Sequence, residues 1–233
     1  MNRNKLLSYP NLANTTYRTV YYIGQPLDIT QLYHFTGIDP TTGLPSVKMA
    51  GTTPTVTDRV IAPYGHPFFG GIINTFNYKD FQLSFALQFN HRNGLLNNSL
   101  SLPLGASYVN QNTAALNRWR KPKDAAYLPA ATVTSTTAYS YFSGSDFNWG
   151  DASYIKFKTL NLTYALPSRL VQKMGMRGVS VYAQGQNLFT WAKQKYTLDP
   201  ETTVGGASPA LGQGLYITMP QLRSMVIGLN CSF

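Results

Sequence analysis

The stretch from Phe81 to Asn90, FQLSFALQFN, alternates apolar and polar side chains without a break. Side chains along a β-strand point to opposite faces in turn, so this stretch has one wholly apolar face. That face consists of Phe81, Leu83, Phe85, Leu87 and Phe89. About ten residues of tilted strand are enough to cross the hydrocarbon core of a bilayer. A half-buried strand of a soluble protein alternates in the same way, usually over about 4–8 residues, so this stretch alone leaves both interpretations open.

Similar patterns predict six further strands, rich in aromatic and β-branched residues. The seven predicted strands cover residues 17–24, 29–36, 72–78, 81–90, 151–166, 179–188 and 221–233. The last strand places five side chains on one face: Met225, Ile227, Leu229, Cys231 and Phe233. We therefore predict an all-β chain of antiparallel strands, with short helices near 113–120 and after Pro167.

The strand predicted over 151–166 changes its phase. Leu160, Leu162 and Tyr164 share one face, whereas Ile155 and Phe157 lie on the other. An extra residue in one strand shifts the alternation by one, so we expect a β-bulge near Lys158.

The connections between the predicted strands alternate in length. Short ones of about 4, 2 and 11 residues interleave with long ones of about 35, 60 and 30. Bacterial outer-membrane barrels have short periplasmic turns and long extracellular loops, whereas a soluble sandwich has no reason to sort its loops. The pattern favours a transmembrane β-barrel. With the long loops outside, Phe233 would end at the periplasmic rim.

Composition agrees with a polar-looped β protein. Only 12% of the residues are charged, against roughly 25% in soluble proteins. No apolar run reaches the roughly 18–20 residues of a membrane helix. The net charge of +10 raises the question of nucleic acid, but the densest basic cluster carries no nucleic-acid motif: Arg118, Arg120, Lys121 and Lys123. We expect no nucleic-acid partner and interpret this cluster as a solvated loop or a lipid-headgroup contact.

Catalytic and metal-binding patterns are missing from the sequence. The three histidines lie far apart, at His34, His66 and His91, and Cys231 is the single cysteine. Asp199 and Glu201 could suggest a glycosidase pair, but two residues apart beside Pro200 they more simply fix a loop or bind solvent. Gly70 and Gly71 are interpreted as a backbone turn. We predict no enzyme activity, no cofactor and no metal, and no substrate-binding residue is identified.

Several segments in this order and spacing resemble one family, the SusC/RagA-type TonB-dependent outer-membrane transporters. The similar stretches are IGQPLD (23–28), GIDPTTGLP (37–45), HPFFGGIINTFNYKDFQLSF (66–85), LNRW (116–119), DASYIKFKTLNLTYALP (151–167), YAQGQNLFTW (182–191) and LDPE (198–201). The terminal aromatic Phe233 resembles the signal read by the outer-membrane assembly machinery.

The resemblance implies that residues 1–233 form the C-terminal portion of a barrel of about 22 strands. It implies an outer-membrane importer of oligosaccharides or peptides in a Bacteroidetes-type bacterium, with a SusD-like surface lipoprotein and the TonB system as partners. The apolar faces of 81–89 and 225–233 would then contact the lipid bilayer and mediate barrel assembly. A signal peptide, a plug domain and the N-terminal strands are absent from the sequence, so we expect the chain alone to be incompetent for transport. The alternative is a soluble surface β-sandwich that binds glycans.

Overall fold

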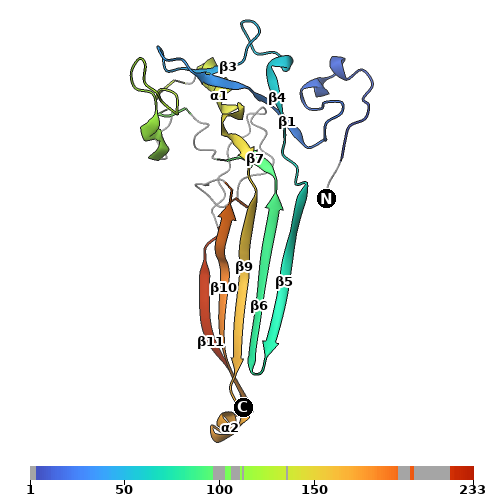
Figure 1. The fold of residues 1–233 in the computed structure, drawn as a ribbon, viewed down its shortest axis with the longest axis vertical. Coiled ribbons are helices and arrows are strands. Elements are labelled where there is room, and N and C mark those ends of the chain that lie inside the picture. The colour runs from blue at the N-terminus through green and yellow to red at the C-terminus, as the bar shows by residue number, and fades with distance from the viewer. Residues whose placement is uncertain are drawn as a thin grey trace.

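A single antiparallel sheet of five long strands dominates the computed structural model, which describes residues 4–96, 103–105, 111, 113–134, 136–193, 200–201 and 221–233. The strand order across the sheet is β11-β10-β9-β6-β5. The strands are β5 (Phe68–Tyr78), β6 (Phe81–His91), β9 (Tyr154–Ala165), β10 (Gly178–Ala192) and β11 (Ser224–Ser232). The sheet is open, with β5 and β11 at its two edges (Figure 1).

Short connections lie at one end of this sheet. A two-residue turn, Lys79–Asp80, joins β5 to β6, and Lys79 takes the left-handed conformation (φ 50°) that such a tight turn requires. The short helix α2 (Ser168–Lys173) lies between β9 and β10 at the same end (Figure 1). The helix predicted after Pro167 is therefore confirmed. We call this end the short-turn end.

The opposite end, here the loop end, holds the remaining elements (Figure 1). In the described part of the chain, three pairs of short strands form there: β1 (Ile29–Tyr33) with β4 (Arg59–Pro63), β2 (Phe35–Ile38) with β3 (Pro45–Val47), and β7 (Asn93–Leu95) with β8 (Trp149–Asp151). The helical elements are α1 (Thr137–Ser143) and the 3-10 turns η1 (Leu12–Asn14), η2 (Thr16–Thr19), η3 (Val56–Asp58), η5 (Thr113–Asn117) and η6 (Asp146–Asn148). The long connection from β6 to β9 thus lies at this end, as the loop-length pattern predicts. The connection from β10 to β11 lies largely outside the described residues.

Buried side chains gather at the loop end rather than on the large sheet. Leu32, Leu128 and Tyr139 are almost fully buried there. The ring of Phe35 packs edge-on against those of Phe142 and Phe147, with centroids 5.5 and 5.0 Å away. The loop end therefore has its own apolar core, built from segments far apart in the sequence.

Two of the resembling stretches meet in this core. Gly43, from GIDPTTGLP, has φ 72°, and a Cβ added to it would lie 2.3 Å from the ring of Trp119, from LNRW. Glycine is needed here both for its conformation and for the close approach of the indole. Asp39 closes the same loop, since its carboxylate accepts the N–H groups of Thr41 and Thr42, which lowers its pKa.

Three sequence predictions are wrong. Residues 17–24 form a 3-10 turn followed by further turns, because Tyr21 stacks on Tyr9 and Tyr17, and Tyr9 packs against Tyr17 at a tilt, with centroids 5.7–6.3 Å apart, instead of lining a strand. The strand predicted over 29–36 exists, as β1 and the start of β2, but its expected place in the barrel wall is wrong, because both segments pair at the loop end; among the described residues, five strands rather than seven form the large sheet. Gly70 and Gly71 lie inside β5 and not in a turn.

Candidate membrane-facing surface and inner polar cluster

Strand register brings most of the large apolar side chains of the five long strands onto one face. Phe85 pairs with Leu160, which pairs with Gly185, which pairs with Met225. We define the apolar face by the residues in register with these: Phe68, Gly70, Ile72, Asn74, Phe76 and Tyr78 of β5; Phe81, Leu83, Phe85, Leu87 and Phe89 of β6; Ile155, Phe157, Leu160, Leu162 and Tyr164 of β9; Val179, Val181, Ala183, Gly185, Phe189 and Trp191 of β10; and Met225, Ile227, Leu229 and Cys231 of β11. Two sets chosen from separate stretches of sequence therefore share a face. Phe233 follows β11 and is exposed.

A β-bulge makes this face continuous. Ala86 pairs with Thr159 while the next residue, Leu87, pairs with Phe157, so Lys158 is the extra residue. The bulge expected near Lys158 is confirmed. Because it shifts the alternation by one, Phe157 and Leu160 lie on the same face despite their odd and even numbers.

The apolar face is exposed along both edge strands of the sheet. Met225, Ile227 and Leu229 of the edge strand are 78%, 81% and 65% exposed, and Ile72 of the other edge is also exposed. Exposed apolar surface of this extent marks contact with a membrane or another protein.

Aromatic rings form a row at each end of the apolar face. Toward the short-turn end, Phe81 stacks on Tyr164 with centroids 4.4 Å apart. Toward the loop end, the stacked pairs are Phe68 with Phe89 and Phe189 with Trp191. From Phe81 to Phe89 the strand rises about 26 Å, or about 20 Å normal to a bilayer at the usual barrel tilt. This is close to the ~25 Å apolar band between the aromatic girdles of outer-membrane barrels.

The opposite face of the sheet is polar along its central strands. Its side chains include Gln82, Ser84, Gln88, Lys156, Thr159, Asn161, Thr163, Ser180, Gln184 and Gln186. Asn161 donates a hydrogen bond of 3.3 Å to the hydroxyl of Ser84 across the strand pair. Water in a barrel lumen would solvate this polar surface, whereas placing these side chains in lipid would cost free energy.

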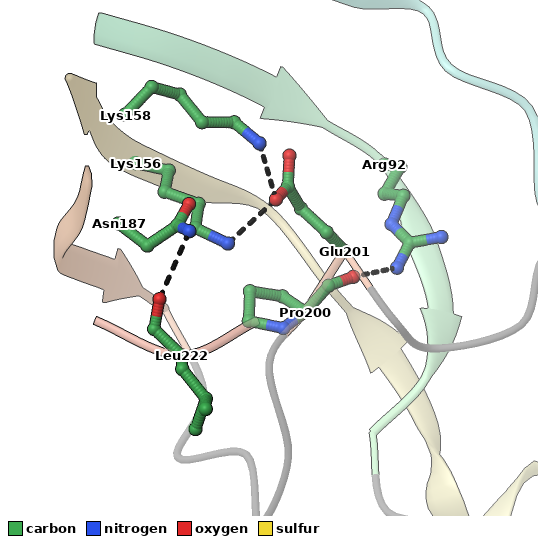
Figure 2. Close-up of polar contacts among 7 residues, drawn as sticks. All are labelled: Arg92, Lys156, Lys158, Asn187, Pro200, Glu201 and Leu222. Atoms are coloured by element: carbon green, nitrogen blue, oxygen red, sulfur yellow. Dashed lines mark hydrogen bonds and ion pairs between the residues drawn. The ribbon is translucent and has the colours of Figure 1, made fainter. Parts of the chain in front are cut away.

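An ion cluster lies on this polar face, next to the bulge (Figure 2). The Nζ atoms of Lys156 and Lys158 lie 2.7 and 2.6 Å from the same atom, Oε2 of Glu201. Lys156 has a side chain 1% exposed and Glu201 one 15% exposed. Burying a charge is costly unless it is paired, and the shared carboxylate provides that pairing.

Backbone contacts attach the same chain segment to the sheet. Nη2 of Arg92 donates a 2.7 Å hydrogen bond to the carbonyl of Pro200, and Nδ2 of Asn187 donates one of 3.2 Å to the carbonyl of Leu222 (Figure 2). Asn187 lies in the bulged part of β10 with φ 53°. Pro200 and Glu201 belong to LDPE, so this resembling stretch fixes a loop to the wall; Asp199 lies outside the described residues.

Each of the three histidines contacts a different polar side chain. Nδ1 of His34 lies 2.8 Å from Oδ2 of Asp146, and the other two histidines contact Asn90 and Ser153 through Nδ1. Within the described residues, no group of three or more His, Cys, Asp or Glu side chains is placed to hold a metal ion. In that same part of the chain, no helix has the length and apolarity needed to span a membrane.

Where β8 leads toward β9, a second ion pair lies at the loop end of the sheet. Nζ of Lys193 is 2.7 Å from Oδ2 of Asp151. Hydrogen bonds from Lys193 and then Ser153 lower the pKa of Asp151 to about 2. The pair joins the chain after β10 to the chain before β9.

The basic cluster of LNRWRKPKD also lies at the loop end. Arg118 and Arg120 donate to the carbonyls of Ala115 and Leu116, and Asp124 accepts the N–H of Arg120. Beside it, Phe35, Tyr127, Asp146 and Phe147 line an open recess of about 480 Å³. Sequence reasoning missed this recess, because its walls come from three separate segments.

Comparison with known proteins finds relatives that are named TonB-dependent receptors. The TonB-dependent receptor P3 of Formosa agariphila is 28% identical over 193 residues, which cover 78% of this chain and 18% of the receptor. The TonB-dependent receptor P26 of the same organism is 30% identical over 180 residues, which cover 70% of this chain and 16% of the receptor. The chain thus spans less than a fifth of the length of these curated relatives. No protein-family model matches the chain.

Solved structures share the fold. The RagAB peptide transporter superposes with a TM-score of 0.63 at 22% identity, over 97% of this chain and 24% of the solved one. The RagAB peptide importer in its open-open state gives a TM-score of 0.61 at 22% identity, over 88% of this chain and 22% of the solved one. These relatives are receptors and transporters rather than enzymes. The sequence, the five-stranded sheet and the comparisons together confirm the resemblance of this chain, over most of its length, to the SusC/RagA-type TonB-dependent receptors.

Proposed function

We propose that this chain forms the C-terminal wall segment of an outer-membrane β-barrel transporter. The complete transporter would import oligosaccharides or peptides, powered through TonB, with a SusD-like lipoprotein over its outer mouth. The apolar face would contact lipid, and the polar face with its ion cluster would line the lumen. The chain alone would not transport.

One observation carries this proposal: a single open sheet has one continuous apolar face and long connections at one end. Among the described strands, β5 and β11 each have one neighbour in the sheet, which leaves a row of unpaired backbone groups along each edge. In lipid such edges must be paired, so further strands are required to close the wall.

The names of the solved neighbours indicate which cargo class, peptides or oligosaccharides, should be tested first. The solved neighbours are named as peptide transporters and importers. Peptides are therefore the first cargo to test, and oligosaccharides, which the family resemblance also implies, are the second. The loop end would face the cell exterior and would be the surface available to a lipoprotein partner.

The alternative, a soluble glycan-binding sandwich, gains little support. A sandwich packs a second sheet about 10 Å from the apolar face of the first. Over the described residues, the other strand pairs gather at the loop end instead (Figure 1).

The test is fractionation of the native bacterium, followed by an immunoblot with an antibody raised against residues 196–205. We expect a band in the outer-membrane fraction that is several-fold larger than the 25.8 kDa of this chain. A band that partitions into the aqueous phase without detergent would overturn the barrel proposal. Substrate uptake by cells that express these 233 residues alone would overturn the claim that the segment cannot transport.

A further inference from the structure

Helix α2 exposes a cationic stripe next to an apolar one. At 3.6 residues per turn, Arg169, Lys173 and Leu170 follow one another around the helix at about 0°, 40° and 100°, and Met174 at the C-cap continues the arc at about 140°. All four side chains are exposed, with Leu170 at 51% and Met174 at 49%. Val171 points the other way and is buried. The helix is therefore anchored by one side and amphipathic on the other.

Positive charge dominates the short-turn end. The turn 79–80 and the connection 166–178 together carry four basic side chains and one acidic one: Lys79, Arg169, Lys173 and Arg177 against Asp80. The end of β11 lies at the same end of the sheet (Figure 1). An anionic surface is the complementary partner for such an end.

The apolar face extends as far as the basic side chains of the short-turn end. The row of Tyr78, Phe81 and Tyr164 marks the end of the apolar face, and Nζ of Lys79 lies 5.4 Å from the ring centroid of Tyr78. Tyrosine and tryptophan prefer the boundary between the acyl chains and the headgroups. Since β9 ends at Ala165 and α2 begins at Ser168, the helix starts directly after the strand that carries this row of rings.

We propose that α2 and the Lys79–Asp80 turn bind the headgroups of anionic phospholipids. Leu170 and Met174 enter the acyl boundary, while Arg169, Lys173 and Lys79 contact the phosphates. The inference rests on the proposed function, because it needs the apolar face to be in a bilayer. It adds a lipid-binding surface of stated chemistry to the short-turn end.

The test uses the full protein purified from outer membranes and placed in nanodiscs of phosphatidylethanolamine with and without phosphatidylglycerol. Native mass spectrometry then counts the phosphatidylglycerol retained after detergent washing. The variant Arg169→Gln/Lys173→Gln removes one Arg and one Lys from α2. The matched control Arg120→Gln/Lys121→Gln removes the same charges at the loop end. We expect the α2 variant to lose about thirtyfold in preference for phosphatidylglycerol over phosphatidylethanolamine, from the usual contribution of a basic residue at an anionic surface, and the control to keep the preference.

Equal retention by the α2 variant and its control would overturn the lipid site, as would co-purification of a periplasmic protein that the α2 variant loses. A fluorescent label at Met174→Cys, in a Cys231→Ser background, gives a second measurement. We expect blue-shifted emission in nanodiscs, whereas water-like emission there would place Met174 away from lipid and overturn the proposal. These results differ from a failure of the proposed function, in which the protein would be missing from the outer-membrane fraction altogether.

Discussion

Removing the carboxylate of Glu201 should destabilise the attachment of the β10–β11 connection to the inner wall. The carboxylate is shared by Lys156 and Lys158 at 2.7 and 2.6 Å, and Glu201→Gln keeps its size while removing its charge. The variant leaves two ammonium groups facing a neutral amide.

The magnitude follows from the burial of the three side chains. Breaking a buried ion pair by removing one partner costs about 3–5 kcal/mol, because a charge stays buried without compensation. Lys156 is 1% exposed and carries most of this cost, whereas Lys158, 26% exposed, can turn to water. We therefore expect about 3 kcal/mol, the low end of that range, which is about 150-fold in the equilibrium for local opening. Lys156→Met removes the buried charge at similar length and leaves Glu201 paired with Lys158, so it should cost less than about 1 kcal/mol.

The assay is hydrogen exchange at the amides of β9 around Lys156 in the detergent-purified protein, together with the rate of protease cleavage between β10 and β11. The double variant Glu201→Gln/Lys156→Met completes the cycle and should be more stable than Glu201→Gln alone, since the uncompensated charge is gone. If Glu201→Gln leaves exchange unchanged, or if Lys156→Met fails to rescue it, the shared carboxylate does not hold this segment.

Two further outcomes are expected. Ile227→Arg places a charge at mid-bilayer and should cost about 2–4 kcal/mol in barrel stability, measured as a lower unfolding temperature of the protein on a semi-native gel. The control Val226→Arg, on the opposite face of the same strand, should cost much less. Equal losses would mean that the apolar face is wrongly assigned. Hydrogen bonds from Lys193 and then Ser153 lower the pKa of Asp151 from 3.8 to about 2, so these contacts should stabilise the loop end above pH 3.8 and be lost as the pH falls to about 2. Lys193→Met should raise this pKa and move the loss to higher pH, measured by the carboxylate carbon shift of Asp151, and an unchanged titration would refute the role of Lys193.

Local alternation was sufficient to locate the long strands. β6 extends one residue beyond the predicted 81–90, and β10 and β11 differ from prediction only at their ends. These strands have one apolar and one polar face, and a two-residue period is visible within the strand itself. The two-residue turn at Lys79–Asp80 was found by length alone, although Lys is an unfavourable residue at its positive φ.

The loop end was beyond this reasoning, because its stability comes from contacts between distant segments. Trp119 covers Gly43, and the carboxylate of Asp146 accepts the N–H of Phe35 across 111 residues. Residues 17–24 carry the composition of a strand, yet ring contacts of Tyr17 and Tyr21 with Tyr9 accompany a turn instead. The Gly70–Gly71 pair predicts a turn, whereas Gly70 lies in a strand with the Phe89 ring over it, where a Cβ would be 2.7 Å from the ring.

Lys158 connects the two faces of the wall. As the extra residue of a bulge, it keeps Phe157 and Leu160 on the same apolar face, which a regular strand of this sequence would split. The bulge also lets Lys158 reach the carboxylate that Lys156 holds on the polar face. The phase break that reveals the bulge is local and was predicted from the sequence. Glu201, 43 residues away, was not linked to it, because no local pattern records which carboxylate will meet two lysines. Deleting Lys158 should therefore leave Phe157 and Leu160 on the apolar face, because they would then lie two residues apart in a regular strand, whereas the ion cluster would lose one of its two lysines.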